Sequence, residues 1–376
     1  MLTSFAGSIG IIGIALIYAV SQGTTTYINT VQEDTLSSYP LTIEASHTDM
    51  STLMLTFMES AQSAHDHEKD AIYSKPAVYD MLNALNNLES TENDLASFKD
   101  FIESAHADPE HPLYDAISGI QYAYDLQLQV YTKDTDGKII VSDTMSLMQD
   151  LMAEYIGMDM SIMTQMAESS PMASMMNSMG GAAGVNLWQE LLPGDDGRLI
   201  NPLLEKQYDV IYGSWPNSYN EIVLVVDENN EIDDMTLYAL GLKSEKEIEE
   251  AFDAVLKGTQ ITTVSQSWTY EEICDMDFRV ILNSDCYTVD EATGNYTDMR
   301  ETEAGLKLLW ADGFDLKISG IIRPSEDATS AMITGSIGYT KALTDHILDR
   351  NTKSDVINQQ KAYPTVNVLT GLPFER

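Results

Sequence analysis

The chain has 376 residues, of which 59 are acidic and 20 are basic, so that its formal net charge is −39. A surface with this charge repels the phosphates of nucleic acids and the headgroups of anionic lipids, and we expect no nucleic acid partner. It would attract cations or cationic peptides, although a well-solvated exterior without any selective site would have the same composition.

Residues 2–20 form an apolar run, LTSFAGSIGIIGIALIYAV, and no charged residue precedes Glu33. A helix that crosses a membrane needs about 20 apolar residues, so the run predicts a transmembrane helix over residues 1–21. A cleaved signal peptide is the alternative, because residues 19–21 resemble a cleavage site, but the usual basic residues before the run are missing. For the same reason, charge alone does not orient the helix.

Small residues recur along this run. Gly7, Gly10 and Gly13 lie three residues apart, and Ser4 continues the series backwards. Small side chains at such spacings allow a second membrane helix to approach closely, so we predict that the three glycines face another helix of a bundle. A lone helix that only anchors the protein is the alternative.

Two segments follow the membrane run. Residues 22–45 predict a stalk and a first strand, the stalk ending before Pro40 because the residue preceding a proline avoids the helical region, and the strand at 41–43. Residues 46–207 predict a mostly helical subdomain with a β-hairpin at 126–141. Its helical repeats begin at Leu53, Val78 and Leu95.

Several methionines of this subdomain share one face of an expected helix. The flexible thioether side chain fills irregular gaps and suits adaptable apolar surfaces. Ordinary core packing is the first interpretation of this face, contact with an apolar substrate or partner is the alternative, and Cu(I) ligation by the thioethers is a third. The residues are Met145, Met148, Met152, Met160 and Met163.

The last part of the chain, residues 208–376, predicts an α/β core subdomain. The apolar pattern predicts strands at 209–212, 221–226, 277–283 and 366–369, a hairpin of 306–310 with 314–322, and a helix at 340–348. Two pairs have the spacing of helix-capping boxes, which mark the starts of two further helices. They are Ser244 with Glu247 and Thr269 with Glu272.

Cys274 and Cys286 are the two cysteines, and they flank the strand expected at 277–283. A strand of about seven residues rises about 23 Å, whereas the Cα atoms of a disulfide lie within about 7 Å of each other. We therefore predict two free or buried thiols.

Motifs for catalysis and metal binding are absent or incomplete. There is no phosphate-binding loop, nucleophile elbow or HExxH sequence. The HDHE run at 65–68 places its histidines on different faces of a helix, and DENNEIDD at 227–234 has Ile232 where a calcium loop needs glycine. Asp233 and Asp234 instead suit the start of a helix. We predict no catalytic, cofactor-binding or metal-binding residue.

Several segments resemble one family. They are the opening run, LSSYPLTI at 36–43, YDVIYGSWPNSYNEIVLVVDENNEI from Tyr208, LYALGL, LKISGIIRP from Leu316, GSIGYTKALT from Gly335, and VNVLTGLPF near the end. Together they resemble the first half of MacB/FtsX-type ABC transporter permeases, in the form common in Gram-positive anaerobes. The opening run and the segment from Tyr208 are the more specific parts of the likeness.

The resemblance implies an α+β fold, in which one N-terminal transmembrane helix is followed by a mixed-sheet extracytoplasmic domain with a large helical insertion. It implies a non-enzymatic permease part in the cell membrane, with its main domain outside the cytoplasm. Such a part transmits ATP-driven motion to export or sense a peptide, lipid or drug.

The implied partners are an ABC ATPase domain or subunit, the remaining permease helices and a second permease in a dimer. We expect the chain to be a fragment, with Met1 an internal or truncated start, and no cofactor in the chain itself. A membrane-anchored or secreted binding protein for a cationic or apolar ligand is the alternative. A cell-surface hydrolase is a third, weaker for want of a nucleophile–base pair.

Overall fold

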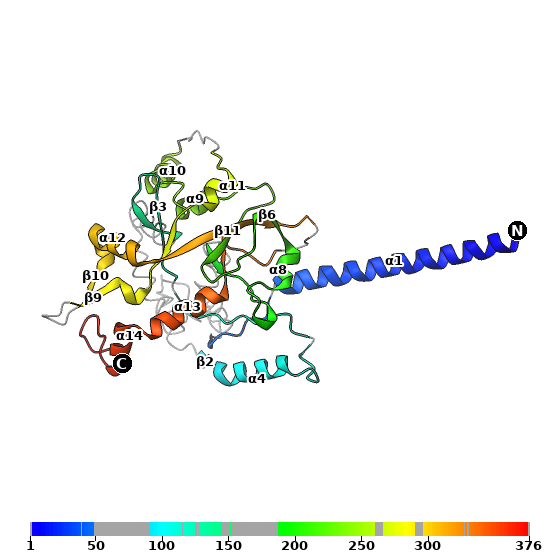
Figure 1. Ribbon diagram of the computed structural model, residues 1–376, viewed down its shortest axis with the longest axis horizontal. Coiled ribbons are helices and arrows are strands. Elements are labelled where there is room, and N and C mark those ends of the chain that lie inside the picture. The colour runs from blue at the N-terminus through cyan, green and yellow to red at the C-terminus, as the bar shows by residue number, and fades with distance from the viewer. Residues whose placement is uncertain are drawn as a thin grey trace, which may run out of the picture. The chain divides into compact units, whose positions relative to one another are not determined.

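The computed structural model describes residues 2–38, 40–48, 90–114, 116–124, 126, 128–144, 147, 151, 187–259, 266–289, 296–326, 328 and 331–374 (Figure 1). The chain divides into two compact units. One comprises residues 1–40, 119–159 and 183–376, and the other comprises residues 41–118 and 160–182. The fold is α+β, as predicted, with one N-terminal apolar helix and a mixed sheet accompanied by helices.

Helix α1 (Leu2–Ser38) is one uninterrupted helix of 37 residues, which is about 55 Å long at 1.5 Å per residue (Figure 1). It ends just before Tyr39 and Pro40, where the sequence predicted its end. The stretch Gly10–Glu33 is long and apolar enough to cross a membrane, and none of it is buried inside the described structure. Apolar side chains lie exposed on all its sides, among them Ile11, Ile12 and Ile14.

An eight-stranded mixed sheet forms the body of the first unit, and its longest strand is β11 (Phe314–Pro324). On one edge β11 runs parallel to β7 (Glu221–Val225); on the other it is antiparallel to β8 (Phe278–Val280) and to β6 (Tyr208–Gly213). Beyond β8 lie β3 (Val130–Lys133) and β4 (Ile139–Val141), and beyond β7 lie β12 (Ile337–Tyr339) and β5 (Trp188–Glu190).

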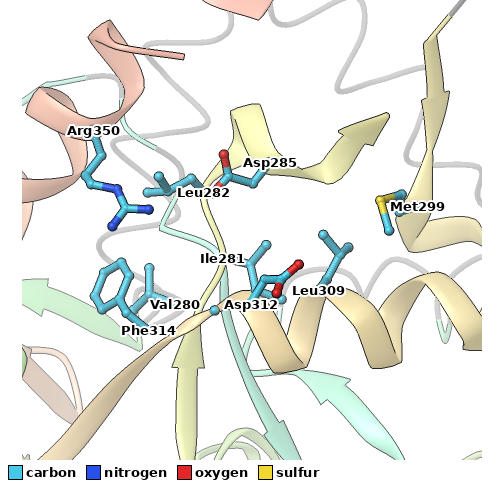
Figure 2. Close-up of a pocket in the computed structure, with 10 residues that line it drawn as sticks. Val280, Ile281, Leu282, Asp285, Met299, Leu309, Asp312, Phe314 and Arg350 are labelled. Carbon is cyan, nitrogen blue, oxygen red and sulfur yellow. The ribbon is translucent and has the colours of Figure 1, made fainter. Parts of the chain in front are cut away.

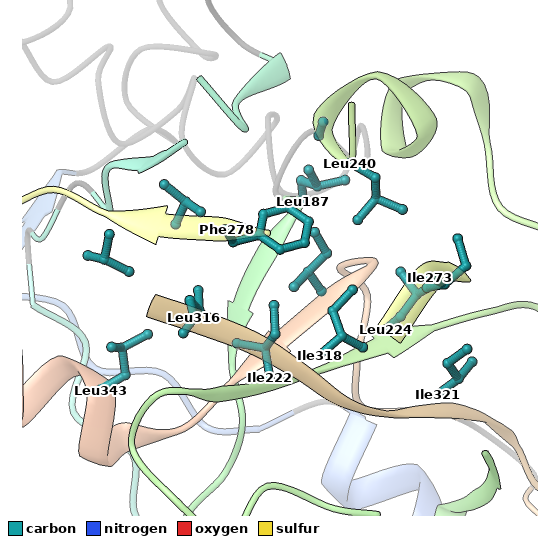
Figure 3. Close-up of a cluster of buried hydrophobic side chains, with 14 of the residues drawn as sticks. Leu187, Ile222, Leu224, Leu240, Ile273, Phe278, Leu316, Ile318, Ile321 and Leu343 are labelled. Atoms are coloured by element: carbon teal, nitrogen blue, oxygen red, sulfur yellow. The ribbon is translucent and has the colours of Figure 1, made fainter. Parts of the chain in front are cut away.

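The centre of this sheet is buried on both faces. In β7, Ile222 and Leu224 point to one face and Val223 to the other, and none of the three is more than 2% exposed. A strand covered on both sides has a continuous apolar sequence, as EIVLVV has, and each such side chain contributes about 1.5–3 kcal/mol on burial. Figure 3 shows the first face, where Leu187, Leu240, Phe278, Leu316, Ile318 and Leu343 join the cluster.

The described helices of the first unit other than α1 are α8 (Pro202–Gln207), α9 (Asp234–Ala239), α10 (Glu245–Lys257), α11 (Tyr270–Cys274), α12 (Glu303–Asp312), α13 (Lys341–Thr352) and α14 (Asp355–Ala362). Both predicted capping boxes are confirmed. The backbone N–H of Ser244 donates to Glu247 at 2.8 Å before α10, and that of Thr269 donates to Glu272 at 2.8 Å before α11. Asp233 caps α9, as its position before a helix predicted.

The predicted hairpin of residues 306–310 with 314–322 is wrong, because residues 303–312 form helix α12. Thr302 begins the helix by accepting a hydrogen bond from the backbone N–H of Gly305 at 3.0 Å. Glu303 and Lys307 then pair at 2.6 Å one turn apart. The apolar run LKLLW fits a short strand or a helix turn equally well, and the cap decides for the helix.

Two short predicted strands are also wrong. Residues 41–43 are irregular, with Leu41 91% exposed, since an extended segment without a hydrogen-bonded neighbour is not a strand. At 366–369 only Val366 bridges to Pro373, because the side chain of Asn367 accepts hydrogen bonds from the backbone of the next residues and makes a turn.

The hairpin predicted at 126–141 is confirmed by the antiparallel pair β3 and β4. Its turn depends on Asp134, whose carboxylate accepts from the backbone N–H groups of Asp136 and Lys138 at 3.0 and 2.8 Å. Both strands belong to the main sheet, as does β5, although all three come from the range 46–207 that was expected to be mostly helical.

The described part of the second unit has a two-stranded antiparallel sheet and one helix. The strands are β1 (Ser46–Thr48) and β2 (Ser90–Glu92), and the helix is α4 (Leu95–Ala107). Asp94 caps α4 by accepting from the backbone N–H of Ser97 at 3.0 Å, which confirms the helix expected from Leu95. The helices expected from Leu53 and Val78 lie outside the described residues.

Both cysteines are free, as predicted. Cys286, on the 3-10 helix η3 (Asn283–Cys286), is 0% exposed, and burial raises the pKa of its thiol to about 11. Cys274 is partly exposed at the end of α11, and burial raises its pKa as well. The thiols are therefore protonated at neutral pH and poorly reactive.

Substitution of Gly213, and of Gly258 as a control, tests how closely β6 lies against β11. Gly213 has φ of 72°, and an added Cβ would lie 2.2 Å from the carbonyl oxygen of Ser319, whereas Gly258 has φ of 65° and open space around an added Cβ. We expect Gly258→Ala to cost about 1–2 kcal/mol of unfolding free energy for its left-handed backbone, and Gly213→Ala to cost clearly more. Thermal unfolding of both variants measures this, and equal losses would contradict the close approach.

Candidate functional site

Helix α13 positions the side chains of the candidate site. Its inward face carries Leu343, Thr344 and Ile347, none more than 4% exposed, which fix the helix on the sheet. Near its start the Thr344 hydroxyl donates to the carboxylate of Glu190 on β5. Because α13 is held along this face, the residues one turn apart on its next face, His346 and Arg350, have defined positions.

The side chain of Glu190, on β5, is half-buried and lies beside the first turn of α13. Its Oε1 is buried without a hydrogen-bond partner among the described residues. Burial raises the pKa of Glu190 above its ordinary value of 4.5, and the hydrogen bond from Thr344 and the charge of Lys341 offset part of that rise. Burial therefore favours the neutral carboxyl, whereas the hydrogen bond from Thr344 favours the charged form.

His346 joins an aromatic cluster beside β11. Its ring stacks on Tyr219 with centroids 4.1 Å apart and meets the edge of Phe314 at 5.3 Å. Burial lowers the pKa of His346, and the positive charge of Arg350 lowers it further. The imidazole therefore acts as a packing group that holds Phe314, the first residue of β11, in place.

A pocket of about 140 Å³ lies next to this cluster, where β8, α12, β11 and α13 converge (Figure 2). Its apolar lining consists of Val280, Ile281, Leu282, Met299, Leu309 and Phe314. Three charged side chains complete it: Asp285 from η3, Asp312 from the end of α12, and Arg350 from α13. Figure 2 shows the Arg350 guanidinium turned toward Phe314 and Val280.

The turn between α12 and β11 shapes the floor of the pocket. Gly313 closes α12 through its N–H to Leu309 at 2.8 Å, and an added Cβ there would lie 3.1 Å from the carbonyl oxygen of Val280. Arg279 donates to the Gly313 carbonyl at 3.2 Å and pairs with Asp315. These contacts hold Asp312 and Phe314 on either side of a fixed turn.

The base of α1 contacts the body through an ion pair. Lys206 on α8 lies 3.2 Å from Glu33 on α1. Asn201 fixes α8 by accepting from the Leu203 N–H at 3.0 Å, and α8 runs directly into β6. Both charged side chains are exposed, so the pair contributes about 0.2–1 kcal/mol and fixes position more than stability.

The predicted packing glycines lie on α1. An added Cβ at Gly10 or Gly13 would meet nothing within 4 Å, so this part of the helix is open to a partner. The surroundings of Gly7 fall outside the described side chains, and Met145, Met148, Met152, Met160 and Met163 fall outside the described residues altogether. Leu147 and Leu151, which lie between Met145 and Met152 in the sequence, are buried in a core cluster with Ile140 and Tyr238.

The acidic loop at 227–234 is internally satisfied. The Asp227 carboxylate accepts from the N–H groups of Asn229 and Glu231 at 2.8 and 2.7 Å, and Asp233 caps α9. Within the described ranges, no group of three or more His, Cys, Asp or Glu side chains could hold a metal ion. The loop therefore has the structural role that its sequence suggested.

Sequence reasoning did not find the pocket. The segment from Leu306 to Phe314 was interpreted as a hairpin, which removed α12 and its terminal Asp312 from consideration. The usable signal was Thr302 followed directly by Glu303, a cap residue with an acidic residue in the first turn. Arg350 had no local signal, because its partners in the pocket come from other elements.

Comparison with known proteins gives no matching family model, no matching curated protein and no matching solved structure. The interpretation of function therefore depends on the chemistry and geometry of this chain.

The pKa of Glu190 is raised and that of Glu247 is lowered, so the two carboxyls predict opposite effects of pH on the melting temperature. A raised folded-state pKa, as in Glu190, gives stability that is full below the unfolded pKa and is lost as pH rises through the folded pKa. Because glutamine stays neutral, we expect Glu190→Gln to gain melting temperature relative to the native chain as the pH rises above the pKa of about 4.3 that glutamate has in an unfolded chain.

Glu247 is the matched control, since the Ser244 N–H lowers its pKa. Its stabilisation is present above the unfolded pKa and is lost as pH falls, so Glu247→Gln should lose melting temperature toward neutral pH. Melting curves at several pH values test both, and parallel trends for the two variants would contradict the assignment.

Proposed function

We propose that the chain is the first membrane helix and the extracytoplasmic domain of an ABC transporter permease of the MacB/FtsX type that its sequence resembles. The observation that carries the proposal is the continuity of α1, whose 37 residues run without a break from the apolar stretch to the folded body. About 20 of them suffice to cross a bilayer, so the rest form a stalk.

The contacts at the base of the stalk support a mechanical role. Glu33 pairs with Lys206 on α8, which leads into β6, and β6 is hydrogen-bonded to the central strand β11. A displacement of α1 would therefore reach the centre of the sheet through short, hydrogen-bonded elements. In the proposed permease, this path passes ATP-driven movement from an ABC ATPase to the outer domain, and the chain itself is not an enzyme.

The surface and the pocket limit the substrate. A net charge of −39 favours cationic peptides over anionic molecules near the outer domain. The pocket of about 140 Å³ is smaller than the roughly 300–1,000 Å³ of drug-sized sites, so a drug or lipid would pass along the domain rather than lodge in this pocket. A dimer of permeases would place two such acidic surfaces around one path.

Labelling in intact cells tests the location. Asp136 lies exposed at the tip of the β3–β4 turn, and Ser4 lies near the start of α1, at the opposite end of that helix from Glu33, which contacts the body. With a membrane-impermeant maleimide, Asp136→Cys should be labelled in intact cells and Ser4→Cys only after the cells are opened. The partly exposed Cys274 of the otherwise native chain gives the background. Labelling of Asp136→Cys only in opened cells would refute an outer domain.

Whether α1 packs against another membrane helix distinguishes a permease from a protein that α1 only anchors. Because membrane helices associate by close backbone packing, Gly10→Leu should keep the helices of the complete permease apart and lower ATP-coupled transport severalfold. Ile12→Leu is the matched control, since Ile12 also lies exposed on α1 but already has a large side chain, so this change adds no bulk.

The melting temperature of the body should be unchanged in both variants, because its core is separate from α1. Full transport by Gly10→Leu would favour the anchored binding protein.

A further inference from the structure

The pocket beside α12 and α13 is lined by Arg350, Asp285 and Asp312, and these three charged side chains form no ion pair with one another or with other described residues. Arg279 and Arg300 each pair with a carboxylate, Asp315 and Asp298 respectively. Arg350 has no such partner among the described residues, although the chain has 59 acidic and 20 basic residues. In a protein this acidic, a guanidinium at an apolar hollow with no carboxylate of its own is available for a carboxylate from outside.

Asp312 and Asp285 provide the opposite charge on the same pocket. Both are exposed, and neither forms an ion pair with another residue in the described part of the chain. In Figure 2 they lie with Arg350 around the apolar side chains of Ile281, Leu309 and Phe314. The pocket thus offers a guanidinium, two carboxylates and an apolar floor.

One class of small molecule matches all three features. An α-amino acid carries a carboxylate, which suits the two parallel donors of a guanidinium, and an ammonium, which suits aspartate. We propose that this pocket binds a free α-amino acid with a short apolar side chain. Its carboxylate lies on Arg350, its ammonium lies toward Asp312 and Asp285, and its side chain lies on the apolar floor.

The size of the pocket limits which amino acids can fit into it. A volume of about 140 Å³ corresponds to roughly four or five groups of the size of a water molecule at about 30 Å³ each. That room holds the side chain of leucine, isoleucine, valine or methionine, while the charged groups remain at the exposed rim. An indole ring is too large.

Net charge favours a zwitterion over either simpler ion. The field of a chain with charge −39 disfavours a lone carboxylate, and Arg350 disfavours a lone ammonium within the pocket. A zwitterion satisfies both sides without adding net charge. The site does not depend on the permease proposal, because an anchored binding protein would hold the same pocket.

Calorimetry with the full chain in detergent micelles tests the proposal. L-leucine should bind at least tenfold more tightly than leucinamide, which lacks the carboxylate, and than 4-methylpentanoate, which lacks the ammonium. L-tryptophan should not bind. Tighter binding of leucinamide would indicate a cationic peptide end, tighter binding of 4-methylpentanoate would indicate an anion site, and either result, or no leucine binding at millimolar concentration, would overturn the proposal.

Variants of Arg350 and Asp312 test which charged group of the amino acid each side chain binds. Arg350→Gln should weaken leucine binding at least tenfold and remove the preference over leucinamide, and Asp312→Asn should reduce the preference over 4-methylpentanoate, since Asp285 remains. Lys353→Gln is the matched control and should bind as the native chain does. Lys353 directly follows α13, three residues after Arg350, and pairs with Asp349.

All three side chains are exposed, so melting temperatures should be unchanged and a loss of binding would not reflect misfolding. Native leucine affinity in Arg350→Gln would also overturn the proposal.

Discussion

Strand β11 is the constraint on which the folded body depends. Its residues 320–322 are hydrogen-bonded to β7 on one edge and to β6 on the other, while its first residues pair with β8. Both faces of its second half are covered, so every backbone group there must find a partner in a neighbouring strand. Such double pairing leaves no room for a side chain where β6 crosses, and Gly213 lies opposite Gly320 at that point. A single strand thereby ties together three strands that come from residues 208–280.

The pocket is a consequence of how β11 begins. Phe314 is its first residue, Val280 is the last residue of its neighbour β8, and α12 ends just before the turn into β11. The apolar floor is therefore the open end of the sheet core. Helix α13 covers this end, fixed by Leu343 and Ile347 below and by the Thr344 bond to Glu190 at its start. Charged groups at the end of one helix and the last turns of another then surround apolar side chains, which gives a rim and a floor of different chemistry.

The sequence predicted the features that local chemistry decides. The end of α1 before Pro40, the caps of α10 and α11, the turn at Asp134 and the doubly buried β7 each follow from a few neighbouring residues. It failed where the partner is distant. Strand β5 has no alternating pattern and exists because it pairs with β12, and α12 was mistaken for a strand because five residues fit either structure. The pocket was beyond reach for the same reason, since Asp312 and Arg350 come together only in the fold.

In the proposed membrane arrangement, the length of α1 reconciles an acidic body with an anionic lipid surface. A bilayer core of about 30 Å takes about 20 residues, whereas the 37 residues of α1 span about 55 Å. Glu33, which contacts the body, lies 12 residues beyond the predicted span of residues 1–21, and this length of about 18 Å exceeds the screening length of about 8 Å at physiological ionic strength, so the headgroups would scarcely repel the body. The stalk contains threonines, which are poor helix formers, yet Thr25, Thr30 and Thr35 donate their hydroxyls to carbonyls one turn back. These three hydroxyls are therefore satisfied within the helix itself, which favours a continuous helix through the stalk.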